Sequence, residues 1–306
     1  MFRQTLRPQE VHIIDDSSTD DSLPAIERAF ANAGSIRCSL KSRENRGIST
    51  TRNELAAAAT TDFIAFLDSD DLYAPQRLER MLEGAPRGGL YFAFSGVDFL
   101  SELGREELDD WHEMYHTFLG QGMSLPTAGF TLLRTNAAIS ASNFVMSRSL
   151  FDAVGGFDDR IKILQDWDFA VRASRFIEPT FIAEPLLTYR VHSRNTSRIA
   201  RGDIARELEF NVANLRDWLS EPTPNPLAPT PRNWPRFFRV FANQSKLLAG
   251  RALPEIPATP SDSTTAARET KAIRDLIAAM RFPESTQSLS RDELMMRCQQ
   301  SWRALS

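Results

Sequence analysis

Apolar, strand-like runs alternate with helix-like segments along the first 100 residues of this 306-residue chain. Strands are expected at 11–14, 36–40, 62–68 and 90–97, and helices at 24–33, 48–59 and 76–82. Gly34 follows the first helix and Pro75 precedes the third, and both residues favour these positions at helix ends. Strands that alternate with helices predict an α/β fold with a mostly parallel sheet and helices on its faces.

Two of the expected strands end in acidic clusters. DDSSTDD begins at Asp15 after the first strand, and DSDD begins at Asp68 after the third. Ligands of such sheets bind beyond the carboxyl ends of the strands. Adjacent carboxylates repel each other unless a cation, a donor group or water separates them, so each cluster is either a solvated turn or part of a site. In the second cluster, the D-x-D pair has the oxygen ligands that Mg²⁺ and Mn²⁺ prefer.

Composition excludes several classes of protein. The net charge of −4 argues against nonspecific nucleic-acid binding, and two distant cysteines argue against a disulfide framework or a zinc site. No run approaches the ~18 apolar residues of a membrane span. The first residues show no export signal, so a cytoplasmic protein is expected.

The remaining chain divides near residue 200. The segment 105–119 predicts an amphipathic helix, and a strand and a helix ended by Gly155-Gly156 follow within 142–156. Residues 1–200 are therefore expected to form the α/β domain. Residues 201–306 are expected to form a helical extension with Pro-rich linkers at 220–235 and 253–265, its last helix capped by Ser290 and Glu293.

Three further groups of residues have both a structural and a functional interpretation. Asn45, Arg46 and Arg52 surround the start of a helix, where anions bind well, but surface arginines are equally common there. Asp166 and Asp168 open another helix, either as capping carboxylates or with one of them as a general base. His192 lies among arginines in an expected loop, YRVHSRN, which suits a diphosphate and its metal ion as well as a structural role.

The order of these motifs is more specific than any one of them. DDSSTD, N-R-G…R-N, a strand ending in D-x-D-D, G-G-F-D, Q-D-W-D and Y-R-x-H follow one another within residues 1–200. Together they resemble the inverting family 2 glycosyltransferases of the GT-A fold. The resemblance implies metal-dependent sugar transfer from a nucleotide-diphosphate sugar, with a UDP-sugar expected, to a hydroxyl of a glycan or lipid-linked glycan. It also implies peripheral association with the inner face of the membrane.

The resemblance also assigns roles to individual residues. The nucleotide-sugar would be bound by Asp15 or Asp16, Asn45, Arg52 and Asp68, and Mg²⁺ or Mn²⁺ by Asp70 with His192 beside it. Asp166 would be the base that deprotonates the acceptor. The family usually has Glu before this aspartate, whereas this chain has Gln165.

Three other classes of protein fit less well. A receiver domain would need a lysine at a later strand end, and no lysine occurs between Lys41 and Lys162. A phosphatase of the haloacid dehalogenase type would need Thr or Val where Leu72 stands. A dinucleotide-binding dehydrogenase would need G-x-G-x-x-G, which is absent.

In the resembling family the DDSSTD motif follows the second strand, and an earlier strand forms one wall of the nucleotide pocket. The present chain is therefore expected to show a GT-A-like sheet short of one strand, with weak or absent activity. Either the natural start lies roughly 30 residues upstream, or the chain is a truncated, non-catalytic relative that binds nucleotide-sugars. The latter is the main alternative to an active transferase.

Overall fold

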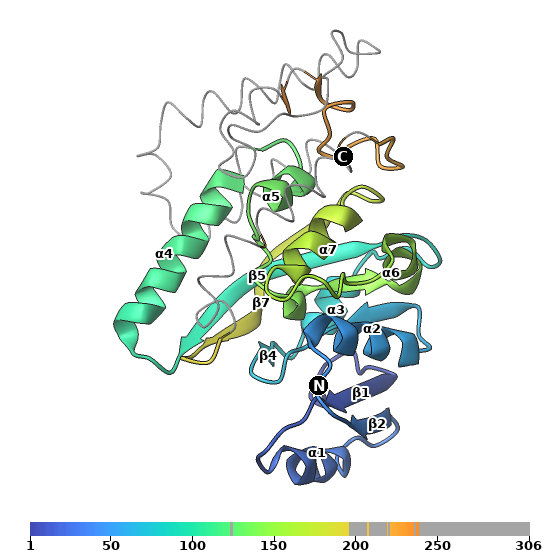
Figure 1. The fold of residues 1–306 in the computed structure, drawn as a ribbon, viewed down its shortest axis with the longest axis vertical. Coiled ribbons are helices and arrows are strands. Elements are labelled where there is room, and N and C mark those ends of the chain that lie inside the picture. The colour runs from blue at the N-terminus through green and yellow to red at the C-terminus, as the bar shows by residue number, and fades with distance from the viewer. Residues whose placement is uncertain (123–124, 196–206, 208–218, 220, 236, 239–306) are drawn as a thin grey trace.

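The computed structural model describes residues 1–122, 125–195, 207, 219, 221–235 and 237–238, which form an α/β fold (Figure 1). The helices are α1 (Ser22–Phe30), α2 (Ile48–Ala58), α3 (Arg77–Leu82), α4 (Arg105–Gly122), α5 (Ala128–Arg134), α6 (Arg148–Val154) and α7 (Gln165–Ala173), with a 3-10 turn η1 (Ala141–Asn143). The strands are β1 (Glu10–Asp15), β2 (Arg37–Ser42), β3 (Phe63–Ala65), β4 (Leu72–Tyr73), β5 (Phe92–Ser101), β6 (Val145–Ser147) and β7 (Thr180–Val191). In the described part of the chain, no helix has the length and apolar character needed to cross a membrane.

The larger sheet is mixed, so the expectation of a mostly parallel sheet is wrong. Its order is β3-β6-β5-β7-β4, and only β5 and β7 run parallel within it. The short strands β4 and β6 account for the difference: β4 pairs antiparallel with β7, and β6 pairs antiparallel with both β3 and β5.

The two strands β1 and β2 form a separate parallel sheet among the described strands. In Figure 1 this small sheet lies below α2, at the lower end of the molecule. Among the described strands, no pairing joins β1, the strand that leads into DDSSTD, to the larger sheet.

Both faces of the larger sheet are covered. Phe92 and Phe94 of β5 pack with Phe169 of α7 in the main core, while Ala93 packs with Met81 of α3 in a second cluster. In a regular strand every second side chain points to the same face, but the residues of β5 in the main core after Phe94 are Val97 and Phe99, one position out of step. The pairing with β7 is irregular here: its register shifts at Ser95 and Gly96, which lie opposite residues 182–187 of β7.

Gly96 allows β5 and β7 to approach closely at this irregularity. A Cβ atom there would lie 2.7 Å from the carbonyl oxygen of Ala183 and 3.0 Å from that of Glu184. Because both contacts are backbone atoms, Gly96→Ala should lower the free energy of unfolding by about 2–3 kcal/mol, as measured by urea denaturation.

Gly120→Ala is the matched control, since a Cβ atom at this helical position meets nothing within 4 Å. It should raise the stability by up to about 1 kcal/mol, because alanine favours a helix over glycine. Equal effects of the two substitutions would show that the close approach of β5 and β7 is not what requires Gly96.

The Pro-rich stretch at 220–235 does not behave as the extended linker that its composition predicts. Trp234 is fully buried, and its ring packs 5.4 Å from that of Phe130 on α5, centroid to centroid. Asn225 donates a hydrogen bond from Nδ2 to the carbonyl oxygen of Ser174 at 2.8 Å. The described part of this Pro-rich stretch therefore packs against the α/β domain. The second Pro-rich stretch and the expected helices after it lie outside the described residues.

Candidate functional site

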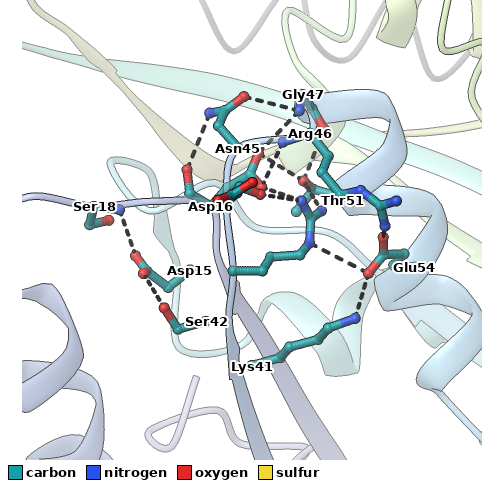
Figure 2. Close-up of polar contacts among 12 residues, drawn as sticks. Asp15, Asp16, Ser18, Lys41, Ser42, Asn45, Arg46, Gly47, Thr51 and Glu54 are labelled. Carbon is teal, nitrogen blue, oxygen red and sulfur yellow. Dashed lines mark hydrogen bonds and ion pairs between the residues drawn. The ribbon is translucent and has the colours of Figure 1, made fainter.

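Asp16 is held at the end of β1 by four donors, shown in Figure 2. Its Oδ1 accepts hydrogen bonds from Nη1 of Arg43 at 2.5 Å and from the backbone N–H of Arg46 at 3.1 Å. Its Oδ2 accepts from the N–H of Gly47 at 3.2 Å and from Oγ1 of Thr51 at 3.1 Å. The carboxylate therefore ties β1 to the start of α2, and donor groups offset its repulsion from Asp15.

Asp15 has its own set of donors. Its carboxylate accepts from the N–H of Ser18 at 3.3 Å and from Oγ of Ser42 at 3.0 Å. Hydrogen bonds from Ser18, and then from Ser42, hold the pKa of Asp15 below its ordinary value. Figure 2 shows the two aspartates with separate sets of partners, so the first acidic cluster is an ordered turn.

Asn45 links the same turn to the helix. Its Nδ2 donates to the carbonyl oxygen of Asp16 at 3.2 Å, and its Oδ1 accepts from the N–H of Gly47 at 3.2 Å. Gly47 has a φ of 87°, in the left-handed region that favours glycine. Sequence reasoning missed Arg43, the cation that lies between Asp16 and Glu54. It stands just after a strand and two residues before the N-R-G motif, which is the only sequence signal for it.

The buried Arg52 forms an ion pair with Asp68, which is partly exposed. Nη2 of Arg52 lies 2.7 and 2.8 Å from the two carboxylate oxygens of Asp68. The guanidinium also lies 5.5 Å from the centre of the Phe157 ring. Its Nε and Nη1 atoms are buried and have no hydrogen-bond partner among the described residues. These two nitrogens carry three N–H groups without an acceptor among the described residues.

Asp70 and His192 meet although 122 residues separate them. Nε2 of His192 lies 2.8 Å from Oδ2 of Asp70, and Nδ1 of the ring accepts a hydrogen bond from the N–H of Arg194 at 3.1 Å. Asp70 is about one third exposed. A carboxylate oxygen and an imidazole nitrogen side by side fit Mg²⁺ or Mn²⁺. The described residues contain no group of three or more potential ligands, so water and a bound phosphate would complete the coordination.

Three other polar residues, Asp71, Tyr189 and Arg190, lie around the acidic loop 68–71 and the end of β7. Asp71 is buried, and burial raises its pKa to about 7, while its Oδ1 accepts from the N–H of Arg190 at 3.1 Å. Asp71 is the fourth residue of DSDD, and neither the motif nor the family resemblance assigns it a role. The sequence predicted a loop for Tyr189 and Arg190, but both residues lie within β7, because the strand continues to Val191. The pKa of Tyr189 is raised by burial and then by Asp71 and Asp166.

Asp166 and Asp168 lie in different environments at the start of α7. Oδ2 of Asp168 accepts from Arg172 at 2.6 and 2.9 Å, and Arg172 also donates to the carbonyl oxygens of Val154 and Gly156. Asp168 therefore joins α7 to the end of α6. Among the described residues, Asp166 has no such ion pair. Its Oδ1 accepts a hydrogen bond from one described backbone donor, the N–H of Trp167, at 2.7 Å. Burial raises its pKa to about 6, against the opposing charge of Arg52.

The predicted site residues thus form two neighbouring groups, one around the acidic loop 68–71 and one around the turn at Asp15 and Asp16. Asp68, Asp70 and Asp71 follow β3, His192 follows β7, and Asp166 opens α7. Asp166 lies within electrostatic range of Arg52 and Asp68. Asp15, Asp16 and Asn45 connect to this group through α2, which also carries Arg52.

Several proteins from bacteria have sequences similar to this chain. The succinoglycan biosynthesis protein ExoU of Rhizobium meliloti is 38% identical over 171 residues, which are 54% of this chain and 48% of that protein. The chondroitin synthase of Escherichia coli is 26% identical over 217 residues, which are 70% of this chain and 29% of that protein. The chain spans between 29% and 63% of the length of the first curated relatives that it matches.

A mannosyltransferase of Pyrobaculum calidifontis, solved in complex with GDP-Man and Mn²⁺, has a similar structure. The TM-score is 0.52 at 15% identity, over 98% of this chain and 79% of that one. This likeness shows the fold, an α/β arrangement of the GT-A type with a curled mixed sheet. The family model described as Glycosyl transferase family 2 matches residues 1–155 of the 306. This chain belongs to glycosyl transferase family 2.

Proposed function

We propose that the chain transfers a sugar from a nucleotide-diphosphate sugar to a hydroxyl group of a glycan or lipid-linked glycan, with inversion at the anomeric carbon. One observation supports this most strongly. Asp166, an aspartate with a raised pKa and without an ion pair among the described residues, lies near the Arg52–Asp68 pair on the side of the fold where Asp70 meets His192. A general base, an anion-binding arginine and a cation site are the three parts that this reaction needs.

The donor side of the site would use the residues around α2. Asp15 or Asp16 would contact the base of the nucleotide, with Asn45 beside it, and Asp68 would face the ribose. The two unpaired nitrogens of Arg52 would donate to the base or the diphosphate. UDP-sugars are the first donors to test. The GDP-Man in the Pyrobaculum mannosyltransferase makes GDP-sugars the second.

Asp70 and His192 would hold Mg²⁺ or Mn²⁺, which supplies a Lewis acid for the negative charge that develops on the leaving diphosphate. Asp166 would take the proton from the acceptor hydroxyl as its oxygen bonds to the anomeric carbon. The bond from that carbon to the phosphate oxygen breaks on the opposite side, so the configuration inverts. A pKa of about 6 leaves the carboxylate ionised, and therefore basic, at neutral pH.

The acceptor class is proposed from the relatives. One is named a chondroitin synthase and another a succinoglycan biosynthesis protein. Both names refer to polysaccharides, so a growing glycan is the acceptor to test, at the inner face of the membrane if it is lipid-linked.

The proposal is tested by a donor screen. The purified 306-residue chain is incubated with UDP- and GDP-sugars and Mn²⁺, and release of the nucleotide diphosphate is measured with and without short glycan acceptors. Release with one donor, lost on chelation, supports the proposal. Binding of a nucleotide-sugar without any release would favour the second candidate, a non-catalytic binding relative. The break between the two sheets beside β1 favours that candidate.

A further inference from the structure

Arg77 is a fully buried arginine with no assigned role. It lies on α3 and is 0% exposed. Among the residues that the structure describes, no carboxylate lies within the 4.0 Å of an ion pair. A guanidinium cannot lose its proton in a protein, so its burial is costly unless its donors are satisfied. Its contacts therefore indicate what it holds.

The guanidinium joins β5 to the turn η1. Nη1 donates to Oγ of Ser95 at 2.8 Å, and Nη2 donates to Oδ1 of Asn143 at 3.1 Å and to the carbonyl oxygen of Ser142 at 3.4 Å. Its plane lies 4.5 Å from the centre of the Tyr73 ring. Asn143 in turn donates to the carbonyl oxygen of Ser95 at 2.8 Å. The arginine fork thus fixes η1 against β5.

The same turn supports the acidic loop of the site. Oγ of Ser142 accepts a hydrogen bond from the backbone N–H of Asp68 at 2.9 Å. Two contacts therefore lead from Arg77 to the loop 68–71: Arg77 donates to the carbonyl oxygen of Ser142, and Oγ of Ser142 accepts from the N–H of Asp68.

We infer that Arg77 is a positioning residue for the acidic loop 68–71 and acts on it through Ser142. The inference rests on the proposed function for the ligand of that loop, a divalent cation with a nucleoside diphosphate. Arg77 touches neither ligand. It keeps η1 in place, and Ser142 then fixes the backbone at Asp68, two residues before Asp70. The fork needs arginine, because a lysine has one nitrogen where three acceptors are spread over two elements.

The first experiment measures the loop without any ligand, by hydrogen exchange in Ser142→Ala and Arg77→Lys. Ser142→Ala removes the acceptor for the Asp68 N–H, so exchange in a peptide spanning 66–73 should be about tenfold faster while peptides from β5 and α7 keep the wild-type rate. Arg77→Lys keeps the charge and should give the same local change. Arg80→Lys, on the same helix but paired with Glu83 and Glu184 at the surface, is the matched control and should change neither region.

The second experiment measures Mn²⁺ binding in the presence of UDP, from the electron paramagnetic resonance signal of free Mn²⁺. Ser142→Ala and Arg77→Lys should bind Mn²⁺ about tenfold more weakly than the wild type and Arg80→Lys. Wild-type exchange at 66–73 in Ser142→Ala, or equal acceleration throughout the fold in both variants, would overturn the inference. So would unchanged Mn²⁺ binding in both variants. If the wild type binds neither Mn²⁺ nor UDP, the proposed function fails, whereas the exchange experiment still decides whether Arg77 positions the loop.

Discussion

Asp166→Asn should lower kcat by about 10²–10⁴-fold and at the same time raise the stability of the unliganded protein at neutral pH. The substitution keeps the shape of the side chain and removes its basicity, so the affinity for the donor should persist. The gain in stability follows from burial, which raises the pKa of Asp166 from 3.8 to about 6. A folded-state pKa above the unfolded value means that the native state binds the proton more tightly, so this residue costs stability as the pH rises through 4 to 6.

The size and pH dependence of this gain make the prediction specific. A shift of this kind corresponds to about 2–3 kcal/mol at most, and asparagine carries no charge at any pH. Urea denaturation at pH 7.5 should therefore show Asp166→Asn more stable than the wild type, and the difference should vanish near pH 4. In the wild type, kcat should fall as the pH drops through about 6, because the base becomes protonated.

Asp168→Asn is the matched control two residues away. It breaks the buried pair with Arg172, whose oxygen–nitrogen distance is 2.6 Å. The free energy of unfolding should fall by about 3 kcal/mol, while the folded fraction should keep most of its kcat. If Asp168→Asn loses kcat more severely than Asp166→Asn at full folding, the general base has been assigned to the wrong carboxylate.

Much of this site was predictable because it lies at the ends of elements with strong local signals. The strand that leads into Asp15, the helix that begins at Ile48 and the glycines that end α6 all occur as expected. The approach of Asp70 and His192 follows from two strands of one sheet, β4 and β7, which pair directly after and before these residues. The element ends depend on neighbours in sequence, whereas the pairing of Asp70 with His192 is expected only from the family resemblance.

What could not be predicted depends on contacts between distant segments. The first helix ends at Phe30, four residues before Gly34, and in the turn between them the carbonyl oxygen of Ala33 accepts a hydrogen bond from Arg7, 26 residues away. Proline in 220–235 indicates an extended chain, but nothing local shows that Trp234 packs on α5. The role of Asp16 as the partner of Arg43 depends on donors 27 or more residues away. Tertiary packing decides each of these features.

Asp70→Ala should abolish metal-dependent nucleotide binding and leave the fold intact. The Asp70 carboxylate is about one third exposed, and His192 is its one side-chain partner described. Removing a partly exposed pair of this kind costs about 1 kcal/mol or less, so the melting temperature should change by only a few degrees. UDP binding in Mn²⁺, measured by calorimetry, should fall to the level that the wild type shows after chelation. Asp152→Ala, which removes an exposed carboxylate from α6, is the control and should bind as the wild type does.

His192→Ala separates a shared cation from two independent contacts. If Asp70 and His192 hold the same ion, either substitution removes most of the metal dependence, and the double variant is no weaker than Asp70→Ala alone. Additive losses would mean that the two side chains act separately, with His192 contacting the diphosphate without the metal. Wild-type UDP binding that is unaffected by chelation would contradict the cation site altogether. The 2.8 Å contact between Nε2 and Oδ2 would then be a structural link between β7 and the acidic loop.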